Sequence, residues 1–305
     1  MITTEFASVK GTYDIHCHAG IPSCDARPFT DIFIAQQAAA AGMEALVLKS
    51  HYENTVARAY YVNQMVPDIK LYGGIALNRY VGGLNPPAVE ATLVAGGKVV
   101  WMPGIDSAHH AEVFGSTGSF EVEGKVVGPK QMLSRKQDSA RGKIRVIEKG
   151  RLKKEAVEIV KLVAKHDAML TGGHLSKEEI FELARLANKE GAKMMIDHAL
   201  SKVPGFTYKE VDQLKELTKL GAYIGFFAAI VFPAILATNI KDDKKCIEEI
   251  GPENCVIASD TGSAPYPIPN EALRTYAQNL FDLGMPLEQL EIMMVKNPRK
   301  LLSLQ

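Results

Sequence analysis

The stretch Tyr13-Asp14-Ile15-His16-Cys17-His18 decides the fold, because it joins a short apolar strand to a pair of histidines near the N-terminus. Side chains alternate between the two faces of a strand, so His16 and His18 point the same way, roughly 6.5–7 Å apart along the backbone. That spacing lets both imidazoles bind one metal ion, with Zn–N bonds of about 2.0–2.1 Å. Cys17 turns to the opposite face as a small core residue. Paired histidines also occur by chance, so a metal site requires ligands from later strands.

Short apolar runs alternate with helical patterns about eight times along the chain. They show no period of two, as expected for parallel strands buried on both faces. The runs end near Ile15–His18, Ala45–Lys49, Leu71–Leu77, Val99–Met102, Met169–His174, Met194–His198, Ala222–Phe226 and Val256–Asp260. This order predicts an α/β fold, a (β/α)8 TIM barrel formed as one domain by residues 1–305, with distortion left open. An open Rossmann-type sheet is disfavoured because no G-x-G-x-x-G follows the first run.

Helical patterns fill the intervals between these runs and carry boundary signals. The predicted helices are Phe29–Ala41, Asn54–Val66, Pro86–Ala95, Lys153–Lys165, Asp242–Ile250, Asn270–Leu283 and Leu287–Val295. Two more open with capping boxes, one formed by Ser176 and Glu179 and the other by Thr207 and Glu210. The last helix is predicted to end before Asn297-Pro298.

One unit is irregular, since about fifty residues separate the fourth strand from its helix, far more than in a usual loop. This insertion covers about residues 104–150, and within it two short β-prone runs flank Glu123-Gly124. That pattern predicts a β-hairpin. The loop after a barrel strand belongs to the face that carries the active site. A lid is therefore one interpretation, and a decorative or oligomer-forming insertion is the other.

Composition excludes several classes of partner. The 35 acidic and 35 basic residues give a net charge of zero, which argues against nucleic acid and anionic membranes as partners. No apolar run is long enough for a membrane span, and the N-terminus does not read as a signal peptide. The four cysteines form no C-x-x-C, as in a cytoplasmic protein with reduced thiols. We expect a small-molecule substrate, and the sequence leaves a homo-oligomer open.

Polar residues gather where the predicted strands end. They are His16, His18, Lys49, His51, His174, His198 and Asp260, with His109 and His110 in the loop after the fourth strand. The carboxyl ends of all barrel strands meet at one rim. Because each buried polar group without a partner costs about 1–3 kcal/mol, their convergence indicates a shared ligand. A metal ion would satisfy many of them at once.

This constellation resembles the metal-dependent amidohydrolase superfamily. The resemblance rests on His16 and His18 after the first strand, single histidines after the fifth and sixth, and Asp260 after the eighth. The ending Asn297-Pro298-Arg299-Lys300-Leu301-Leu302 is similar to the Asn-Pro-x-x-Leu-Leu tail common there. The match covers essentially the whole chain and is greatest to a branch without a known substrate.

The resemblance implies roles for these residues. His16, His18 and Asp260 would bind a metal ion, and His174 would be a further ligand of this ion or a second one. His198 would bind a second metal or stay free as a catalytic electrophile or acid. Asp260 would also take the proton from the attacking water.

The number and type of metal ions stay open. Two-metal members usually carry a carboxylated lysine or a glutamate after the fourth strand, where this chain has Trp101-Met102-Pro103. Lys49, on the second strand, is a carboxylated bridge, a substrate-anchoring cation or a salt-bridged rim residue. One ion is favoured over two, zinc is the first choice, and Mn, Fe or Ni also suit these ligands. His51, His109 and His110 remain for substrate contact or a further metal.

Three functions compete. The first is a metal-dependent hydrolase of a small molecule with an amide, ester, lactone or phosphoester bond, with Asp260 and His198 as catalytic residues. The second is a non-hydrolytic lyase, a metal-dependent decarboxylase, which uses much the same one-metal constellation. The third is a non-catalytic barrel that binds a metal or a ligand.

Overall fold

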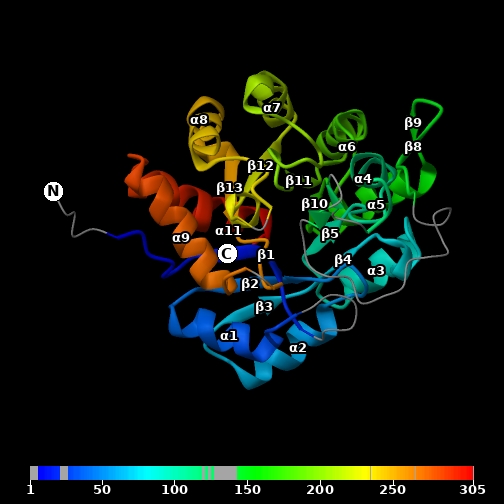
Figure 1. Ribbon diagram of the computed structural model, residues 1–305. Coiled ribbons are helices and arrows are strands. Elements are labelled where there is room, and N and C mark those ends of the chain that lie inside the picture. Colours follow the sequence, from blue (N-terminus) through cyan, green and yellow to red (C-terminus); the bar gives the residue numbers. More distant parts are fainter. Residues whose placement is uncertain are drawn as a thin grey trace.

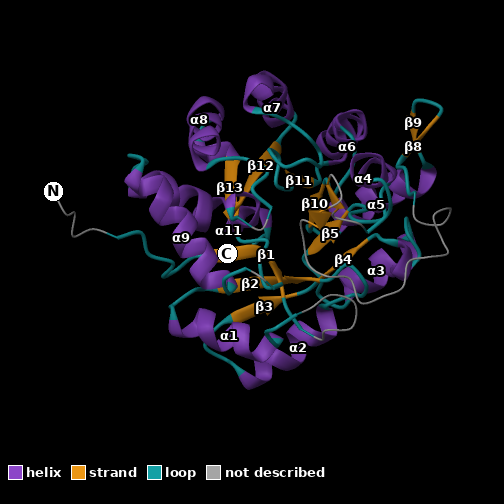
Figure 2. Cartoon of the chain, in the orientation of Figure 1, coloured by secondary structure: helices purple, strands orange, loops and turns teal. Residues whose placement is uncertain are grey.

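The protein consists of parallel strands surrounded by helices. The computed structural model describes residues 6–20, 27–118, 121–122, 125–126, 143–233, 235–264 and 266–304. Helices α1, α2, α3, α5, α6, α7, α8 and α9 lie around the outside (Figure 1), and the strands lie within them (Figure 2). The prediction of a single domain over residues 1–305 stays a prediction.

The strands form two parallel sheets. The first has the order β1-β2-β3 and the second the order β13-β12-β11-β10-β5-β4. The strands are β1 (Tyr13–His18), β2 (Ala45–Lys49), β3 (Lys70–Tyr72), β4 (Gly74–Ala76), β5 (Val99–Trp101), β10 (Met169–Thr171), β11 (Lys193–Ile196), β12 (Ala222–Phe227) and β13 (Cys255–Ala258). They lie close to the predicted apolar runs, and their burial on both faces explains the lack of a period of two.

The first and last strands meet at their carboxyl ends. The His18 backbone N–H donates to the Thr261 carbonyl and the Asp260 N–H to the His16 carbonyl, each at 2.8 Å. In the described part of the chain, no continuous ladder joins β13 to β1 or β3 to β4. The strand arrangement is therefore that of a distorted barrel, tied together at the rim where the polar residues lie.

The helices that cover the strands begin and end close to the predicted positions. They are α1 (Asp31–Ala40), α2 (Val56–Met65), α3 (Pro86–Val94), α5 (Lys154–Lys165), α6 (Lys177–Glu190), α7 (Val211–Lys219), α8 (Ile240–Ile250) and α9 (Pro269–Asp282). Both predicted capping boxes are present: Ser176 with Glu179 opens α6, and Thr207 with Glu210 opens the 3-10 turn Tyr208–Glu210 that leads into α7. None of the helices within the described ranges is long and apolar enough to cross a membrane.

The third predicted strand, Leu71–Leu77, is wrong as one continuous element, because β3 and β4 are separated at Gly73. Thr55 at the start of α2 occupies this break. Its Oγ1 accepts the Gly74 N–H at 2.9 Å, and its own N–H donates to the Gly74 carbonyl at 3.0 Å. A Cβ on Gly73 would lie 2.5 Å from the Val56 backbone, so only glycine allows this approach.

The insertion after β5 contains more regular structure than the single predicted hairpin. That hairpin is present as β6 (Glu121–Val122) paired antiparallel with β7 (Lys125–Val126). Helix α4 (Ala108–Phe114) and a second hairpin, β8 (Ile147–Glu148) with β9 (Arg151–Leu152), were not predicted from the sequence. Residues 127–142 of the predicted insertion lie outside the described residues.

The end of the chain also differs from the prediction. Helix α10 (Leu287–Glu291) continues through a π-helical turn (Ile292–Lys296) into α11 (Asn297–Leu301), so Asn297-Pro298 does not end the helix. Pro298 lies in the first turn of α11, directly after the π-helical turn. Asn297 Nδ2 anchors this turn by donating to the carbonyls of Pro252 at 2.9 Å and Cys255 at 2.7 Å.

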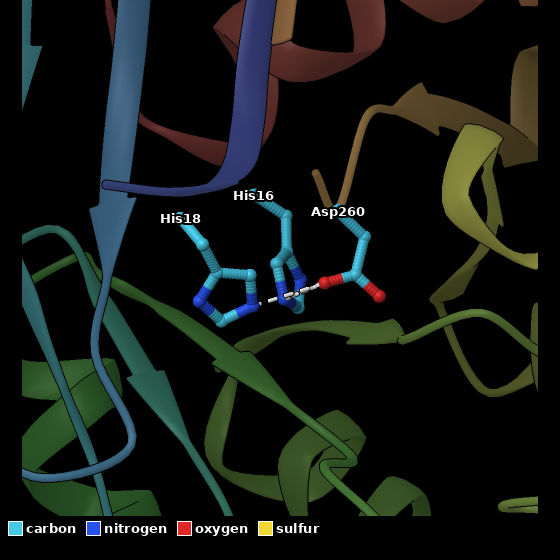
Figure 3. A group of neighbouring side chains, drawn as sticks. All are labelled: His16, His18 and Asp260. Atoms are coloured by element: carbon cyan, nitrogen blue, oxygen red, sulfur yellow. Dashed lines mark hydrogen bonds and ion pairs between the residues drawn. The ribbon is translucent and has the colours of Figure 1, made fainter. Parts of the chain in front are cut away.

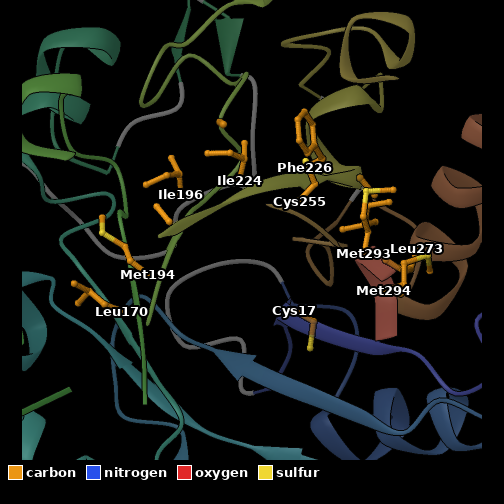
Figure 4. Packing of buried hydrophobic residues seen from close by; sticks show 14 of the residues in the cluster. Cys17, Leu170, Met194, Ile196, Ile224, Phe226, Cys255, Leu273, Met293 and Met294 are labelled. Carbon is orange, nitrogen blue, oxygen red and sulfur yellow. The ribbon is translucent and has the colours of Figure 1, made fainter. Parts of the chain in front are cut away.

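Two apolar clusters form the core. The larger one lies between the strands and the helices, and Figure 4 shows part of it, including Cys17. The smaller one fills the space between the strands and includes Ile15, Trp101 and Phe227. A register shift in β1 between Asp14 and Cys17 explains how Ile15 and His16 both contact this inner cluster although they are adjacent.

Candidate active site

The predicted polar residues converge on a cavity of about 200 Å³ at the carboxyl ends of the strands. Six of them line it: His18, Lys49, His51, His174, His198 and Asp260. They come from five different strand ends, so the convergence is a property of the fold. His16 lies below them, fully buried, with its ring packed edge-on against Trp101 and Phe227.

His16, His18 and Asp260 form a compact group that can hold a metal ion, with one possible ligand atom from each within 4.8 Å of the others. Figure 3 shows both imidazoles directed toward the same carboxylate. Asp260 Oδ1 lies 3.2 Å from His16 Nε2 and 3.1 Å from His18 Nε2. Two neutral imidazoles and one carboxylate are a ligand set that suits zinc and related divalent ions.

Asp197 fixes the orientation of His16. Its Oδ1 lies 3.2 Å from His16 Nδ1, and its Oδ2 accepts hydrogen bonds from Thr171 Oγ1 at 2.5 Å and from the Gly173 N–H at 3.0 Å. An ionised carboxylate can only accept, so the His16 proton lies on Nδ1 and Nε2 presents a lone pair. Burial raises the pKa of Asp197, but its hydrogen bond with His16 outweighs this and lowers the pKa.

The residues present fit a cation between His16 and Asp260. His16 Nε2 is buried and has no hydrogen-bond partner in the described part of the chain. With the proton on Nδ1, the Nε2 lone pair and Asp260 Oδ1 face each other at 3.2 Å with no hydrogen between them. Such a contact is repulsive unless a positive charge lies between the two atoms. The geometry therefore agrees with metal binding better than with a simple hydrogen bond.

The His18 ring is also neutral, but Arg27 can only donate to its Nδ1, so its proton lies on Nε2 and must leave that nitrogen before it can bind an ion. Burial, together with the Arg27 guanidinium, lowers the pKa of His18 to about 3. Arg27 Nη2 lies 3.4 Å from His18 Nδ1, and its Nη1 donates to Ser263 Oγ. The Arg27 side chain thus spans from the first strand to the loop after the last one. The sequence analysis missed Arg27, although it follows the first strand closely.

Asp260 and His198 both adopt left-handed backbone conformations, with φ of +53° and +31°. Such conformations cost about 1–3 kcal/mol each for residues other than glycine, and they cluster at functional sites. Next to Asp260, Gly262 packs against the end of β1, where a Cβ would lie 1.6 Å from the His18 carbonyl oxygen. Burial raises the pKa of Asp260, but the adjacent His16 and His18 outweigh this and hold it well below the usual range.

Hydrogen bonding also assigns the tautomer of His198. Ser201 Oγ donates its single proton to the Val203 carbonyl, so toward His198 Nδ1, at 3.0 Å, it acts as an acceptor. The His198 proton therefore lies on Nδ1, and Nε2 carries the lone pair. Burial lowers the pKa of His198, which keeps the ring neutral. A neutral ring with a free Nε2 suits a metal ligand or a proton acceptor.

His174 is held by the insertion. Its Nδ1 lies 2.8 Å from His110 Nδ1, and its carbonyl accepts a hydrogen bond from Ser107 Oγ at 2.6 Å. Ser107 also caps α4 by accepting the His110 N–H at 2.9 Å. Burial, followed by the neighbouring His110 and His198, lowers the pKa of His174 well below the usual range. The start of the insertion thus forms part of the site.

The structure does not bring all predicted substrate residues to the cavity. Lys49 and His51 line it, and Asn78 Nδ2 donates to the His51 carbonyl at 3.1 Å. His110 is fully buried behind His174. His109 lies on the outer side of α4, with Nδ1 3.8 Å from Glu112 Oε2, and is not among the described residues that line the cavity.

Sequence reasoning missed several residues of the cavity. Ser201, Ser263 and Tyr266 line it together with Arg27, and each lies in a loop that follows a predicted strand. Their position on the active-site face of a barrel was the available signal. Loops have no periodicity, so the sequence does not show which of their side chains turn inward.

Comparison with known families gives one match. Residues 11–225 match the model of a family described as "Family of unknown function (DUF6282)", and this span covers more than half of the 305 residues. The chain belongs to the DUF6282 family. No curated protein sequence matches it.

Solved structures show what fold this DUF6282 protein has. An amidohydrolase from Burkholderia multivorans with bound zinc has a TM-score of 0.57 and 11% identity, covering 96% of this chain and 99% of the other. A 2,6-dihydroxybenzoate decarboxylase in complex with 2,6-dihydroxybenzoate has a TM-score of 0.59 and 11% identity, covering 97% and 100%. An amidohydrolase from Pseudomonas aeruginosa has a TM-score of 0.57 and 13% identity, covering 96% and 95%.

These neighbours confirm the predicted fold. It is that of the amidohydrolase-type TIM barrels, and the structural match extends over nearly the whole chain. At 11–13% identity the likeness shows the fold alone. The roles of individual residues in this DUF6282 protein rest on its own geometry.

Proposed function

We propose that the protein is a metal-dependent hydrolase of a small molecule with an amide, ester, lactone or phosphoester bond. The observation that carries this proposal is the group formed by His16, His18 and Asp260, of which His18 and Asp260 line a cavity of small-molecule size. The fold neighbours include amidohydrolases, one of them with bound zinc, which supports an enzyme of this type.

His16, His18 and Asp260 would hold one divalent ion, with zinc as the first choice and Mn, Fe or Ni as alternatives. A bound ion of this kind supplies Lewis-acid activation of a water molecule and of the substrate's carbonyl or phosphoryl oxygen. Lone pairs on His16 Nε2 and His198 Nε2 are available to it because their Nδ1 protons are engaged by Asp197 and Ser201. His174, whose ring centroid lies 5.1 Å from that of His198, is the next candidate ligand.

Asp260 is the proposed general base. Its Oδ1 faces the two histidines, whereas Oδ2 points away from them (Figure 3) and has no hydrogen bond to any described residue. This second oxygen can accept the proton of the attacking water. His198 lies on the same cavity wall and, with its lone pair on Nε2, can accept a hydrogen bond or bind the ion there. Lys49 and His51 would contact the substrate.

A zinc-loading experiment combined with a hydrolysis panel tests this proposal. The protein is stripped with a chelator, its metal content is measured by elemental analysis, and zinc is returned. We expect about one ion per chain and release of acid or alcohol from at least one substrate of an amide, ester, lactone and phosphoester panel. The proposal is refuted if chelation removes neither the metal nor the activity, or if no substrate of the panel yields a product.

A lyase is the second candidate, and two observations favour it. A structural neighbour is a decarboxylase, with a TM-score of 0.59. Strand β5 corresponds to the fourth predicted strand, and Trp101 and Met102 at its end are fully buried apolar residues. This strand end therefore lacks the bridging ligand of two-metal hydrolases. A carbon dioxide release assay with aromatic and related acids distinguishes this function from hydrolysis.

We propose a cytoplasmic location for the protein. Cys17, Cys246 and Cys255 are buried free thiols, and a reducing compartment preserves this state. Measuring its distribution between cell fractions tests this location.

A further inference from the structure

The lining of the cavity combines two chemistries. The histidines, Lys49 and Asp260 are polar, whereas Phe114, Val203, Ile230, Ile235 and Leu236 are apolar. A substrate that fills the cavity must therefore combine a polar group with an apolar body.

Lys49 is a buried cation without an acceptor. It lines the cavity, is 3% exposed, and has no hydrogen bond or ion pair within the described ranges. Its Nζ lies 5.8 Å from the centroid of the Trp101 ring, and the charges of Asp197 and Asp260 favour its protonated form without a direct contact. A buried ammonium group is costly unless it is paired, so an anionic partner from outside the chain would complete its surroundings.

Tyr266 is a second donor without a partner. It lines the cavity, is 8% exposed, and its hydroxyl is buried without a hydrogen bond to the described part of the chain. The charges of the described lining residues are also unbalanced, because Arg27, Lys49 and Lys202 face one carboxylate, Asp260. The cavity thus favours an anion even before a divalent metal ion adds its charge.

The volume limits the size of the ligand. A dry apolar cavity of about 150 Å³ accommodates benzene. The cavity of about 200 Å³ therefore holds one ring, or a branched chain of similar size, together with one small polar group.

We propose that the substrate is a small monocarboxylic acid, with its carboxylate at Lys49 and Tyr266 and one ring-sized apolar body against the wall of Ile230 and Ile235. A carboxylate matches two unpartnered donors with its two oxygens, whereas a phosphate has three. This assignment rests on the proposed function, since it places the bond to be cleaved beside His16, His18 and Asp260.

Binding measurements with defined probes test the assignment. Zinc-loaded protein is titrated by calorimetry with benzoate, with its neutral analogue benzamide, with phenylphosphonate and with the longer biphenyl-4-carboxylate. We expect benzoate to bind at least roughly 10-fold more tightly than each of the others, because a hydrogen bond to a charged group contributes about 1.5–3 kcal/mol. Equal affinity for benzoate and benzamide, tighter binding of phenylphosphonate, or equal binding of the biphenyl acid would overturn the proposal.

Variants separate Lys49 from the metal. Lys49→Met keeps the length of the side chain, and we expect it to weaken benzoate binding roughly 10-fold or more while benzamide binding stays unchanged. Lys165→Met, on the exposed end of α5, is the matched control. Circular dichroism and thermal unfolding verify that both variants fold, and unchanged benzoate affinity in folded Lys49→Met overturns the proposal. A carbamate carbon on Lys49 after incubation with 13C-bicarbonate would overturn it as well.

The metal content of each sample is measured by elemental analysis, which makes the two proposals separable. If the protein retains no zinc but binds benzoate through Lys49, the carboxylate site stands and the proposed hydrolase fails. If it retains zinc and hydrolyses a neutral substrate while Lys49→Met changes nothing, the hydrolase stands and the carboxylate site fails.

Discussion

The histidines at the ends of β1 and β10 have different neighbours. At the ends of β1 and β13, His16 and His18 meet carboxylates: Asp260 Oδ1 lies within 3.2 Å of both, and Asp197 holds the far side of His16. At the end of β10, His174 meets another imidazole, with its Nδ1 2.8 Å from that of His110. On the first side each imidazole contacts a carboxylate, whereas on the second side an imidazole contacts another imidazole.

This difference shows what each side can bind. Burial and Lys49 act to lower the pKa of His16, but Asp260 and Asp197 outweigh them and raise it, as expected where positive charge is favoured. Burial lowers the pKa of His174 and of His51 well below the usual range, so both rings stay neutral. We infer that the carboxylate side binds the metal ion and that the imidazole side completes its coordination or contacts the substrate.

Removing the shared carboxylate should have the largest effect. Asp260→Asn keeps the shape of the side chain but removes its charge and its capacity to accept the proton of water. We expect metal affinity to fall by more than about 100-fold and turnover by at least roughly 100-fold. Elemental analysis and the hydrolysis panel measure the two effects.

Asp282→Asn, at the exposed end of α9, is the matched control for Asp260→Asn. If Asp260→Asn retained its metal and its turnover rate, the carboxylate side would not be the side that binds the metal ion.

The Asp197→Asn substitution should weaken metal binding without removing a ligand. The neutral amide no longer favours the proton on His16 Nδ1, so the lone pair on Nε2 is less available. We expect about a 10–100-fold loss of metal affinity, measured by competition with a chromogenic chelator. Asp14→Asn is the control, because Asp14 Oδ1 accepts the backbone N–H of His16 and Ser259 rather than contacting an imidazole.

Replacement of His110 tests the imidazole side. His110→Phe removes the Nδ1 contact that fixes the ring of His174. We expect turnover to fall roughly 10-fold through misplacement of His174, while metal content remains near the wild-type value. If His110→Phe lost as much metal as Asp197→Asn, the two sides would be equivalent and the distinction between them would be wrong.

The smallest effect concerns stability in acid. The folded-state pKa of His51 is depressed, whereas an unfolded histidine titrates near about 6.5, so its neutral form stabilises the fold fully above that pH. This stabilisation is lost as the pH falls below about 6.5, because the unfolded chain then binds the extra proton. In chelated protein, His51→Gln should therefore reduce the loss of unfolding free energy between pH 6.5 and 4.5.

The change in slope should amount to at most one proton, about 1.4 kcal/mol per pH unit, measured by urea unfolding at several pH values. Parallel curves for His51→Gln and the wild type would show that His51 does not remain neutral in the folded state.

The sequence determined the fold class and much of the floor of the cavity. Apolar runs without a period of two predicted parallel strands, because burial on both faces removes alternation. Polar residues at strand ends predicted that His18, Lys49, His174 and Asp260 would meet, since the carboxyl ends of barrel strands lie at one rim. These signals are local, and their combination depends only on the order of the elements.

Other features were decided only by tertiary structure. The role of Asp197 toward His16, the contact between His110 and His174, and the inward position of Arg27 and Tyr266 depend on which loops lie side by side. The break at Gly73 follows from the position of Thr55 on α2. No local pattern specifies such contacts, because they join residues whose positions are set by the packing of separate strand–helix units.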